Sequence, residues 1–184
     1  MRHIAVIDIG KTNAKVALVA RESLTEVAVM RRPNAVLRGP PYPHYDIEGL
    51  WDFILDALRR FQAQFGVDAI SITTHGASAV LLDVEGKLAA PALDYEFDGP
   101  DSLAAEYDAA RPPFAETGSP RLPLGLNLGA QLFWLFRTVP GLLERTRTIL
   151  TYPQYWAFRL SGVAVNEVTS LGCHTDLWDS AAGR

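Results

Sequence analysis

The 184-residue sequence has one cysteine, Cys173, and two methionines. A single cysteine excludes an internal disulfide framework and suits a reducing cytoplasm. No apolar run approaches the roughly 18 residues that a membrane helix needs. The amino terminus also lacks a signal-peptide layout, because Asp8 interrupts its apolar stretch. We therefore expect a cytoplasmic globular protein without a membrane partner.

An excess of basic charge is also missing. The chain has 17 Lys and Arg against 21 Asp and Glu, which gives a net charge of −4 at pH 7. The basic residues are scattered, so the sequence predicts no nucleic-acid partner. The hydrophobic fraction of 48% is ordinary. A chain of this length supports one domain that buries roughly 70% of its unfolded surface.

Hydrophobic patterning predicts strands and helices in alternation. Three strands at 4–7, 15–20 and 26–30 form a predicted β-meander, and apolar residues at helical spacing follow the N-cap residue Asp46 as far as Gly66. Further strands are expected at 69–73, 79–83, 88–89 and 147–150, and helices at 127–138, 153–160 and within 98–121. This order predicts an α/β domain built on a mixed sheet.

The turn "DIGKTNAK", residues 8–15, carries polar residues between two apolar strands. Gly10 permits positive φ and close backbone approach, so successive N–H groups can converge on an anion. Thr12 and Asn13 add side-chain donors, and Lys11 and Lys15 add positive charge. A carboxylate at the strand end, Asp8, suits a hydrated Mg²⁺ that bridges to phosphate. The alternative is an ordinary solvated hairpin, since neither a Walker A loop nor a dinucleotide fingerprint is present.

The longer stretch "DIGKTNAKVALV" resembles the first phosphate motif of the FGGY carbohydrate kinases, which the family writes as Asp-x-Gly-Thr-Thr-x-x-Lys/Arg. Asp8, Gly10, Thr12 and Lys15 match this motif. Lys11 departs from it by replacing a small hydroxyl residue, and both a phosphate clamp and an ordinary turn lysine stay open for it. The resemblance implies that Asp8, Gly10, Lys11, Thr12, Asn13 and Lys15 bind ATP, with Asp8 on Mg²⁺.

Three later segments resemble the same family in the same order. "ISITTHGASAVLLDVEGKLAAPAL" places His75 and Gly76 at sugar-contact positions, and Glu96 stands for a substrate-binding Asp although the Arg that often follows is missing. "NLGAQLFWL" resembles the helix over the sugar site, and "YPQYWAFRLSGVAVNEVTSLGCHTDLWD" resembles the segment after it. Asn127 with Gln131 leans toward rhamnulokinases and fuculokinases.

The resemblance implies the ribonuclease H-like fold of the actin, sugar kinase and heat-shock ATPase superfold, with residues 1–184 as an incomplete amino-terminal lobe. Family members are about two and a half times longer, so the catalytic base is expected beyond Arg184 and the second nucleotide-binding lobe is absent. The implied activity of the intact enzyme is ATP-dependent phosphorylation of a ketose such as L-rhamnulose or L-fuculose. This chain alone is expected to be inactive.

Several alternatives stay open at this stage. The chain is either part of such a kinase or a stand-alone module that binds sugar or nucleotide without chemistry. A homodimer is one alternative for the oligomeric state, and the identity of the sugar is open. Trp134, Trp156 and Phe158 are expected in the core rather than on a sugar. Asp176 and Asp179 are expected to end a strand, and Cys173 with His174 lacks the second cysteine of a structural zinc site.

Overall fold

The computed structural model describes residues 2–183, which divide into two compact units. The first unit comprises the residues up to Leu37 together with Tyr45–His75. The second comprises Arg38–His44 and the residues from Gly76 onward. Within the described part of the chain, no helix is both long enough and apolar enough to cross a bilayer.

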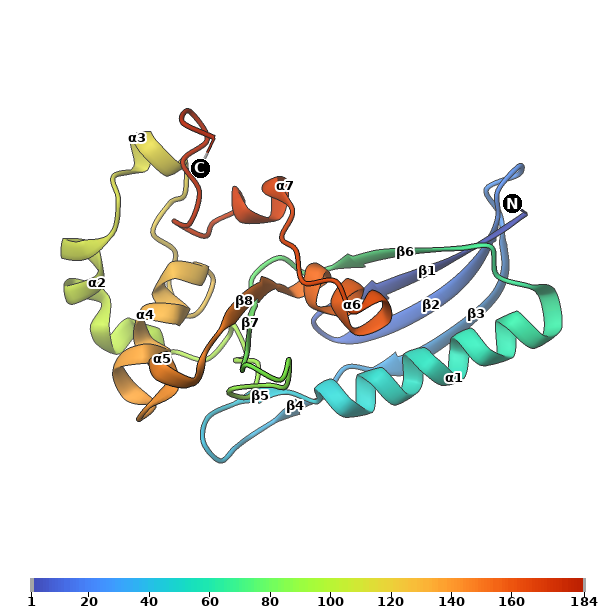
Figure 1. Ribbon diagram of the computed structural model, residues 1–184, viewed down its shortest axis with the longest axis horizontal. Coiled ribbons are helices and arrows are strands. Elements are labelled where there is room, and N and C mark those ends of the chain that lie inside the picture. The colour runs from blue at the N-terminus through green and yellow to red at the C-terminus, as the bar shows by residue number, and fades with distance from the viewer. Residues whose placement is uncertain (1, 184) are drawn as a thin grey trace. The chain divides into compact units, whose positions relative to one another are not determined.

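A four-stranded mixed sheet forms the first unit (Figure 1). Its strands are β1 (His3–Ile9), β2 (Asn13–Ala20), β3 (Glu26–Pro33) and β6 (Ala69–Thr74), in the order β3-β2-β1-β6. Strand β2 pairs antiparallel with both β1 and β3, as the predicted meander requires, and β6 runs parallel to β1. The predicted mixed sheet is therefore confirmed.

Helix α1 (Ile47–Phe65) covers one face of this sheet and packs against β1, β2 and β3 (Figure 1). Its start is fixed by Asp46, whose side chain accepts a hydrogen bond from the Gly49 N–H at 3.0 Å and pairs with Arg32 at 2.5 Å. One stripe of the helix and one face of β1 are buried: Leu50, Ile54, Ala57 and Phe61 on the helix, and Ala5, Ile7 and Ile9 on the strand. The helical and strand periodicities read from the sequence thus meet in one core.

The second unit combines a two-stranded antiparallel sheet with short helices. The strands are β7 (Ala79–Leu82) and β8 (Thr148–Thr151). The helices are the 3₁₀ helix η1 (Gly99–Leu103), α2 (Ala104–Ala110), α3 (Phe114–Thr117), α4 (Leu128–Thr138), α5 (Leu142–Arg145), α6 (Tyr152–Ser161) and α7 (Val168–Leu171). Two further short strands, β4 (Val36–Leu37) and β5 (His44–Tyr45), pair with each other.

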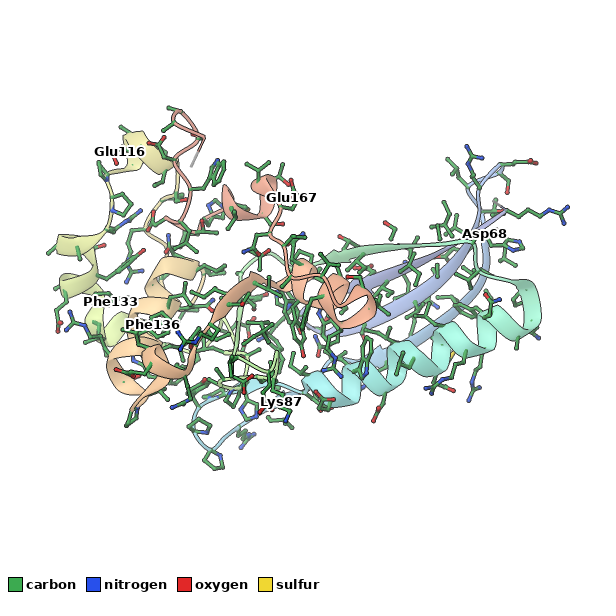
Figure 2. The ribbon with its side chains drawn as sticks, viewed as in Figure 1. Asp68, Lys87, Glu116, Phe133, Phe136 and Glu167 are labelled. Atoms are coloured by element: carbon green, nitrogen blue, oxygen red, sulfur yellow. The ribbon has the colours of Figure 1, made fainter. Side chains whose placement is uncertain are left out.

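The core of the second unit is built on α4. Its buried residues Leu128, Leu132 and Leu135 cluster with Leu81 of β7 and Leu93. Phe136 packs at the margin of this cluster, and Figure 2 shows it on α4 beside Phe133. Trp156 of α6 is fully buried, and Trp134 packs against the α4 cluster. Trp134 and Trp156 therefore have the packing role that their helical spacing predicted, whereas Phe158 is only partly buried.

Three sequence predictions are wrong in this unit. Residues 88–89 form no strand, and Leu88 makes only an isolated bridge to Leu82. Neither Asp176 nor Asp179 ends a strand, because both lie in the loop after α7, where Asp176 has a φ of 59° and a buried side chain. A short apolar run and a lone acidic residue are compatible with several local structures, and tertiary hydrogen bonds decide between them.

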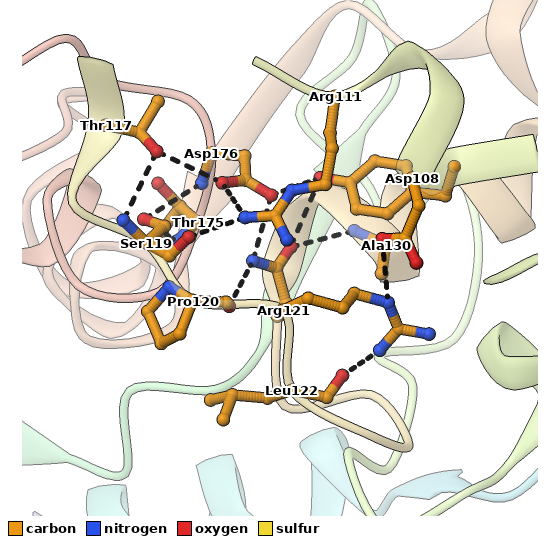
Figure 3. Close-up of polar contacts among 12 residues, drawn as sticks. Asp108, Arg111, Thr117, Ser119, Pro120, Arg121, Leu122, Ala130, Thr175 and Asp176 are labelled. Carbon is orange, nitrogen blue, oxygen red and sulfur yellow. Dashed lines mark hydrogen bonds and ion pairs between the residues drawn. The ribbon is translucent and has the colours of Figure 1, made fainter. Parts of the chain in front are cut away.

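The Asp176 carboxylate is the centre of a buried polar network (Figure 3). It accepts hydrogen bonds from the Tyr107 hydroxyl at 2.7 Å, the Asn127 amide at 3.0 Å and the Thr117 hydroxyl at 3.2 Å. It also pairs with the Arg111 guanidinium at 2.9 Å. Burial and the bond to Asp176 raise the pKa of Tyr107, so the phenol stays a donor. One carboxylate thus ties the carboxyl-terminal loop to α2, α3 and the start of α4.

Replacing this carboxylate should destabilise the protein strongly. Asp176→Ala leaves the buried Arg111 without its carboxylate and Tyr107 without its acceptor, so we expect a loss of about 3 kcal/mol or more in the free energy of unfolding. Urea denaturation measures this loss. Asp108→Asn is the matched control, because the Asp108 pair with Arg121 is 3.5 Å long and its carboxylate is half exposed; it should cost less than about 1 kcal/mol. Equal losses in the two variants would contradict the role of the network.

Candidate functional site

The predicted phosphate turn is a tight hairpin between β1 and β2. The Gly10 N–H donates to the Asn13 carbonyl at 2.9 Å, which leaves Lys11 and Thr12 at the tip. Gly10 does not use the positive φ that a glycine permits, and its N–H is already bonded within the turn. The backbone approaches closely there, because an added Cβ would lie 3.2 Å from the Asn13 carbonyl oxygen, which would have to shift slightly. The backbone groups that can meet an anion are therefore those of the tip.

Thr12 and Asn13 are exposed at this tip, where the Asn13 amide donates to the Thr12 hydroxyl at 3.2 Å. Asn34 supports the turn from β3's end: its backbone N–H donates to the Thr12 carbonyl at 2.9 Å, and its side-chain amide donates to the Gly10 carbonyl at 2.8 Å. Asn34 thus holds the hairpin through the carbonyl groups of Thr12 and Gly10. Its side-chain donors face outward.

Asp8 lies just before the turn on the sheet face opposite α1. In the strand register it is beside Lys15 of β2 and Thr73 of β6. Its neighbours Ile7 and Ile9 are fully buried under α1, whereas Asp8 is only partly buried. No group of three or more His, Cys, Asp or Glu residues suited to a metal occurs among residues 2–183. Mg²⁺ commonly uses one or two protein carboxylates plus phosphate oxygens, so Asp8 alone fits such an ion.

The two lysines of the turn take different directions. The Lys15 ammonium pairs with Glu26 at 3.4 Å, and Glu26 lies opposite Val19, four residues farther along β2 from the turn. The Lys11 ammonium instead lies over the ring of Tyr45, 5.4 Å from its centroid. This distance is within the range of a cation–π contact. Lys11 is therefore the lysine whose charge stays at the tip.

His75 lies directly beside the phosphate turn in the first unit. Its backbone N–H donates to the Ile9 carbonyl at 3.0 Å and so extends the parallel pairing of β6 with β1 by one residue. The Thr74 hydroxyl donates to the His75 carbonyl at 2.8 Å. The imidazole packs on Tyr45, with 5.1 Å between ring centroids. The fold thus brings the predicted sugar contact and the predicted phosphate turn together.

Gly76 opens the second unit and faces free space. A Cβ built on it would meet no atom within 4 Å, and its φ is not in the left-handed region. Neither packing nor backbone strain therefore demands a glycine at this position.

Glu96, the third predicted sugar contact, is exposed on a turn of the second unit. Its backbone N–H donates to the side chain of Asp94 at 3.1 Å, and the Phe97 N–H donates to the Asp94 carbonyl at 3.0 Å. Asp94 is buried, so it fixes the shape of this turn. The carboxylate of Glu96 is carried at the surface by that fixed turn.

Gln131 connects the two sugar-contact segments of the second unit. This fully buried residue of α4 donates from its amide to the carbonyls of Ala77, at 2.8 Å, and Gly125. The Gly125 N–H in turn donates to the Tyr95 carbonyl at 2.8 Å. The residues next to Gly76 and Glu96 are therefore joined through one glutamine side chain.

Sequence reasoning gave no positioning role to three residues that support the candidate site: Tyr45, Asp94 and Gln131. Tyr45 comes from outside every motif, and only the fold brings it to Lys11 and His75. A signal for Gln131 was available, because a glutamine on the apolar face of α4 has to find buried partners. Asp94 offered a similar signal as an acidic residue two positions before Glu96 in an Asx-type turn.

Comparisons with known proteins identify the family of the chain. Residues 3–179 match the amino-terminal domain of the FGGY family of carbohydrate kinases. A rhamnulokinase of Klebsiella pneumoniae is 28% identical over 97% of this chain and 39% of its own length. The chain thus spans about two fifths of the curated relatives that it matches.

Solved structures share the fold. A carbohydrate kinase from Novosphingobium aromaticivorans is 43% identical with a TM-score of 0.88, over 97% of this chain and 37% of that chain. A glycerol kinase of Plasmodium falciparum, solved with ADP, has a TM-score of 0.81 at 19% identity, over 100% of this chain and 39% of that chain. The second likeness shows the fold alone. With the family model matching nearly its whole length, the chain belongs to the FGGY family of carbohydrate kinases, and residues 3–179 correspond to the family's amino-terminal domain.

Proposed function

We propose that this chain acts as the amino-terminal lobe of an ATP-dependent sugar kinase, in which a second nucleotide-binding lobe completes the active site. The proposed substrate is a ketose such as L-rhamnulose or L-fuculose. The likeness to rhamnulokinases supports this class of sugar, and the short span relative to those proteins supports a missing second lobe. A kinase with an exposed free thiol, Cys173, suits the reducing cytoplasm.

The observation that carries the proposal is the hydrogen bond from the His75 N–H to the Ile9 carbonyl. Phosphoryl transfer needs the sugar hydroxyl and the γ-phosphate in near contact. This bond puts His75 next to Ile9, where β1 ends between Asp8 and Gly10, on the same sheet edge as the turn. The closeness of His75 to the turn supports the proposal that a sugar on His75 and a phosphate on the turn meet.

Each residue then has a defined task. The exposed Thr12 and Asn13 donate hydrogen bonds to the terminal phosphates of ATP, and Lys11 adds positive charge at the tip. The exposed pair of Lys15 with Glu26 is weak enough to exchange for phosphate. On the sugar side, His75 and Glu96 bind hydroxyl groups, and Gly76 leaves room for the ring.

Asp8 would hold Mg²⁺ beside the turn, and the ion would neutralise charge on the phosphate oxygens. The sugar hydroxyl gives its proton to a carboxylate that we assign to the remaining part of the enzyme. Its oxygen then forms a bond to the γ-phosphorus, the bond from that phosphorus to the bridging oxygen breaks, and ADP leaves. This chain's residues orient both reactants.

The test is ATP-dependent phosphorylation by the full-length gene product, assayed across a panel of ketoses that includes L-rhamnulose and L-fuculose. The proposal requires turnover of at least one member. Sugar or nucleotide binding without any turnover would replace the kinase by a binding module. The intact mass of the native protein, compared with 20.2 kDa for this chain, decides whether a second lobe is covalently attached.

Asp8→Asn should abolish turnover and spare sugar binding. The amide cannot replace a charged metal ligand, so we expect kcat to fall on the order of 100-fold or more. The dissociation constant for the sugar, measured by titration calorimetry, should stay within about twofold because Asp8 contacts no sugar in the proposal. Asp56→Asn is the matched control on the solvent side of α1, where it removes only a surface pair with Arg60. Full turnover in Asp8→Asn would refute the assigned role of the turn.

Substitutions at Gly76 should act on the sugar and leave the fold intact. Because an added Cβ meets open space, Gly76→Ala and Gly76→Val should change the free energy of unfolding by less than about 0.5 kcal/mol. The sugar KM should rise with the size of the side chain, to roughly tenfold for valine, while the KM for ATP stays constant. A sugar KM that is indifferent to both changes would place the sugar elsewhere.

A further inference from the structure

Tyr45 touches one residue from each half of the proposed site. The Lys11 ammonium of the phosphate turn lies 5.4 Å from the centroid of its ring. The imidazole of His75, the proposed sugar contact, lies 5.1 Å away with its plane tilted by 41°. These three residues come from distant points of the sequence and all belong to the first unit.

The ring is held firmly enough to act as a platform. Tyr45 is 2% exposed. The residue after it, Asp46, is fixed three times: its N–H donates to the Ala35 carbonyl at 3.3 Å, its carboxylate caps α1, and that carboxylate pairs with Arg32. The space around the cap is tight, because a Cβ on Gly49 would lie 2.1 Å from the Asp46 carboxylate. Burial of the ring and the fixed backbone beside it therefore restrict where the ring lies.

We propose that Tyr45 is a positioning residue that sets Lys11 and His75 relative to each other and so aligns the phosphate with the sugar. This inference rests on the proposed function. Lys11 is a long, flexible side chain at an exposed hairpin tip, and the ring face restricts where its charge lies. His75 has its backbone fixed by Ile9, and the ring sets the orientation of its imidazole. Contacts of these two kinds are each worth about twofold to tenfold in affinity.

The consequence concerns Lys11 in particular. This lysine stands where the family motif has a small hydroxyl residue, which is too short to reach a ring in this way. The structure therefore gives Lys11 a defined partner, and the ring that it contacts also contacts His75. Lys11 and Tyr45 should accordingly behave as one functional unit in nucleotide binding.

The experiment compares variants of the full-length enzyme by steady-state kinetics and by the binding of ADP and sugar. Tyr45→Leu removes the ring and should raise the KM for ATP and the KM for sugar, each about threefold to tenfold. Tyr45→Phe keeps the ring and should resemble the wild type in both. Phe61→Leu is the matched control, since it trims another buried aromatic ring of the same unit; it should lower Tm without moving either KM.

A double-mutant cycle tests the link to Lys11. Lys11→Met should raise the KM for ATP, and adding it to Tyr45→Leu should give a combined effect clearly smaller than the product of the two. If the rise in the KM for ATP of the double variant equals the product of the two single rises, Lys11 works independently of the ring, and the proposal is overturned. Equal KM changes in Tyr45→Leu and Phe61→Leu would also overturn it, because they would reflect general loosening.

The outcomes separate this inference from the proposed function. If the wild type phosphorylates no sugar, the dissociation constants for ADP and sugar still show whether Tyr45 affects binding. The positioning role of Tyr45 can therefore be supported even where the kinase assignment fails. If the wild type turns over and Tyr45→Leu leaves both KM values unchanged, only the platform fails. A wild type that binds neither ADP nor sugar would overturn both.

Discussion

The parallel pairing of β6 with β1 is the constraint on which the candidate site depends. Antiparallel pairing of β1 with β2 is local and needs only a hairpin, but parallel pairing requires the whole crossover through α1. Once it forms, the carboxyl ends of β1 and β6 lie at one edge of the sheet. The hydrogen bond from the His75 N–H to the Ile9 carbonyl is the last one between these two strands. It brings His75, which is 66 positions from Ile9 in the sequence, to the hairpin that follows β1. Ligands of α/β folds bind at such strand ends.

Sequence periodicity was sufficient for the elements that make this pairing. The apolar stripe from Ile47 to Phe65 predicted α1 with its cap at Asp46, and alternation predicted the meander. Local pattern failed where long-range bonds decide the structure. Asp176 adopts a left-handed φ because Tyr107, Thr117 and Asn127 converge on its carboxylate, and no window of sequence around residue 176 contains those partners.

For the candidate site too, the sequence predicted what is local and not what depends on long-range contacts. The motifs identified the residues at the strand ends, because those residues are consecutive and their spacing is visible. The motifs did not identify the residues that hold these strand ends in place. Of the two properties that a glycine offers at position 10, the turn uses the close backbone approach to Asn13 and not a positive φ. Tyr45 and Gln131 have no spacing relation to the residues that they contact, so only the tertiary structure reveals them.

The residues that the sequence predicts to contact the sugar are held by two separate sets of contacts, one around Tyr45 and one around Gln131. His75 is set within the first unit by a strand bond and an aromatic ring. The segments around Gly76 and Glu96 are set within the second unit by a buried amide and a backbone bond. His75 and Gly76 are adjacent in sequence, so the peptide bond between them joins the two sets of restraints. Loss of the Gln131 side chain therefore acts first on the segments of Ala77 and Gly125, whereas loss of the Tyr45 ring acts on Lys11 and His75 together. Under the proposed function, the two losses should therefore have different kinetic effects, because only Tyr45 contacts a residue of the predicted phosphate turn.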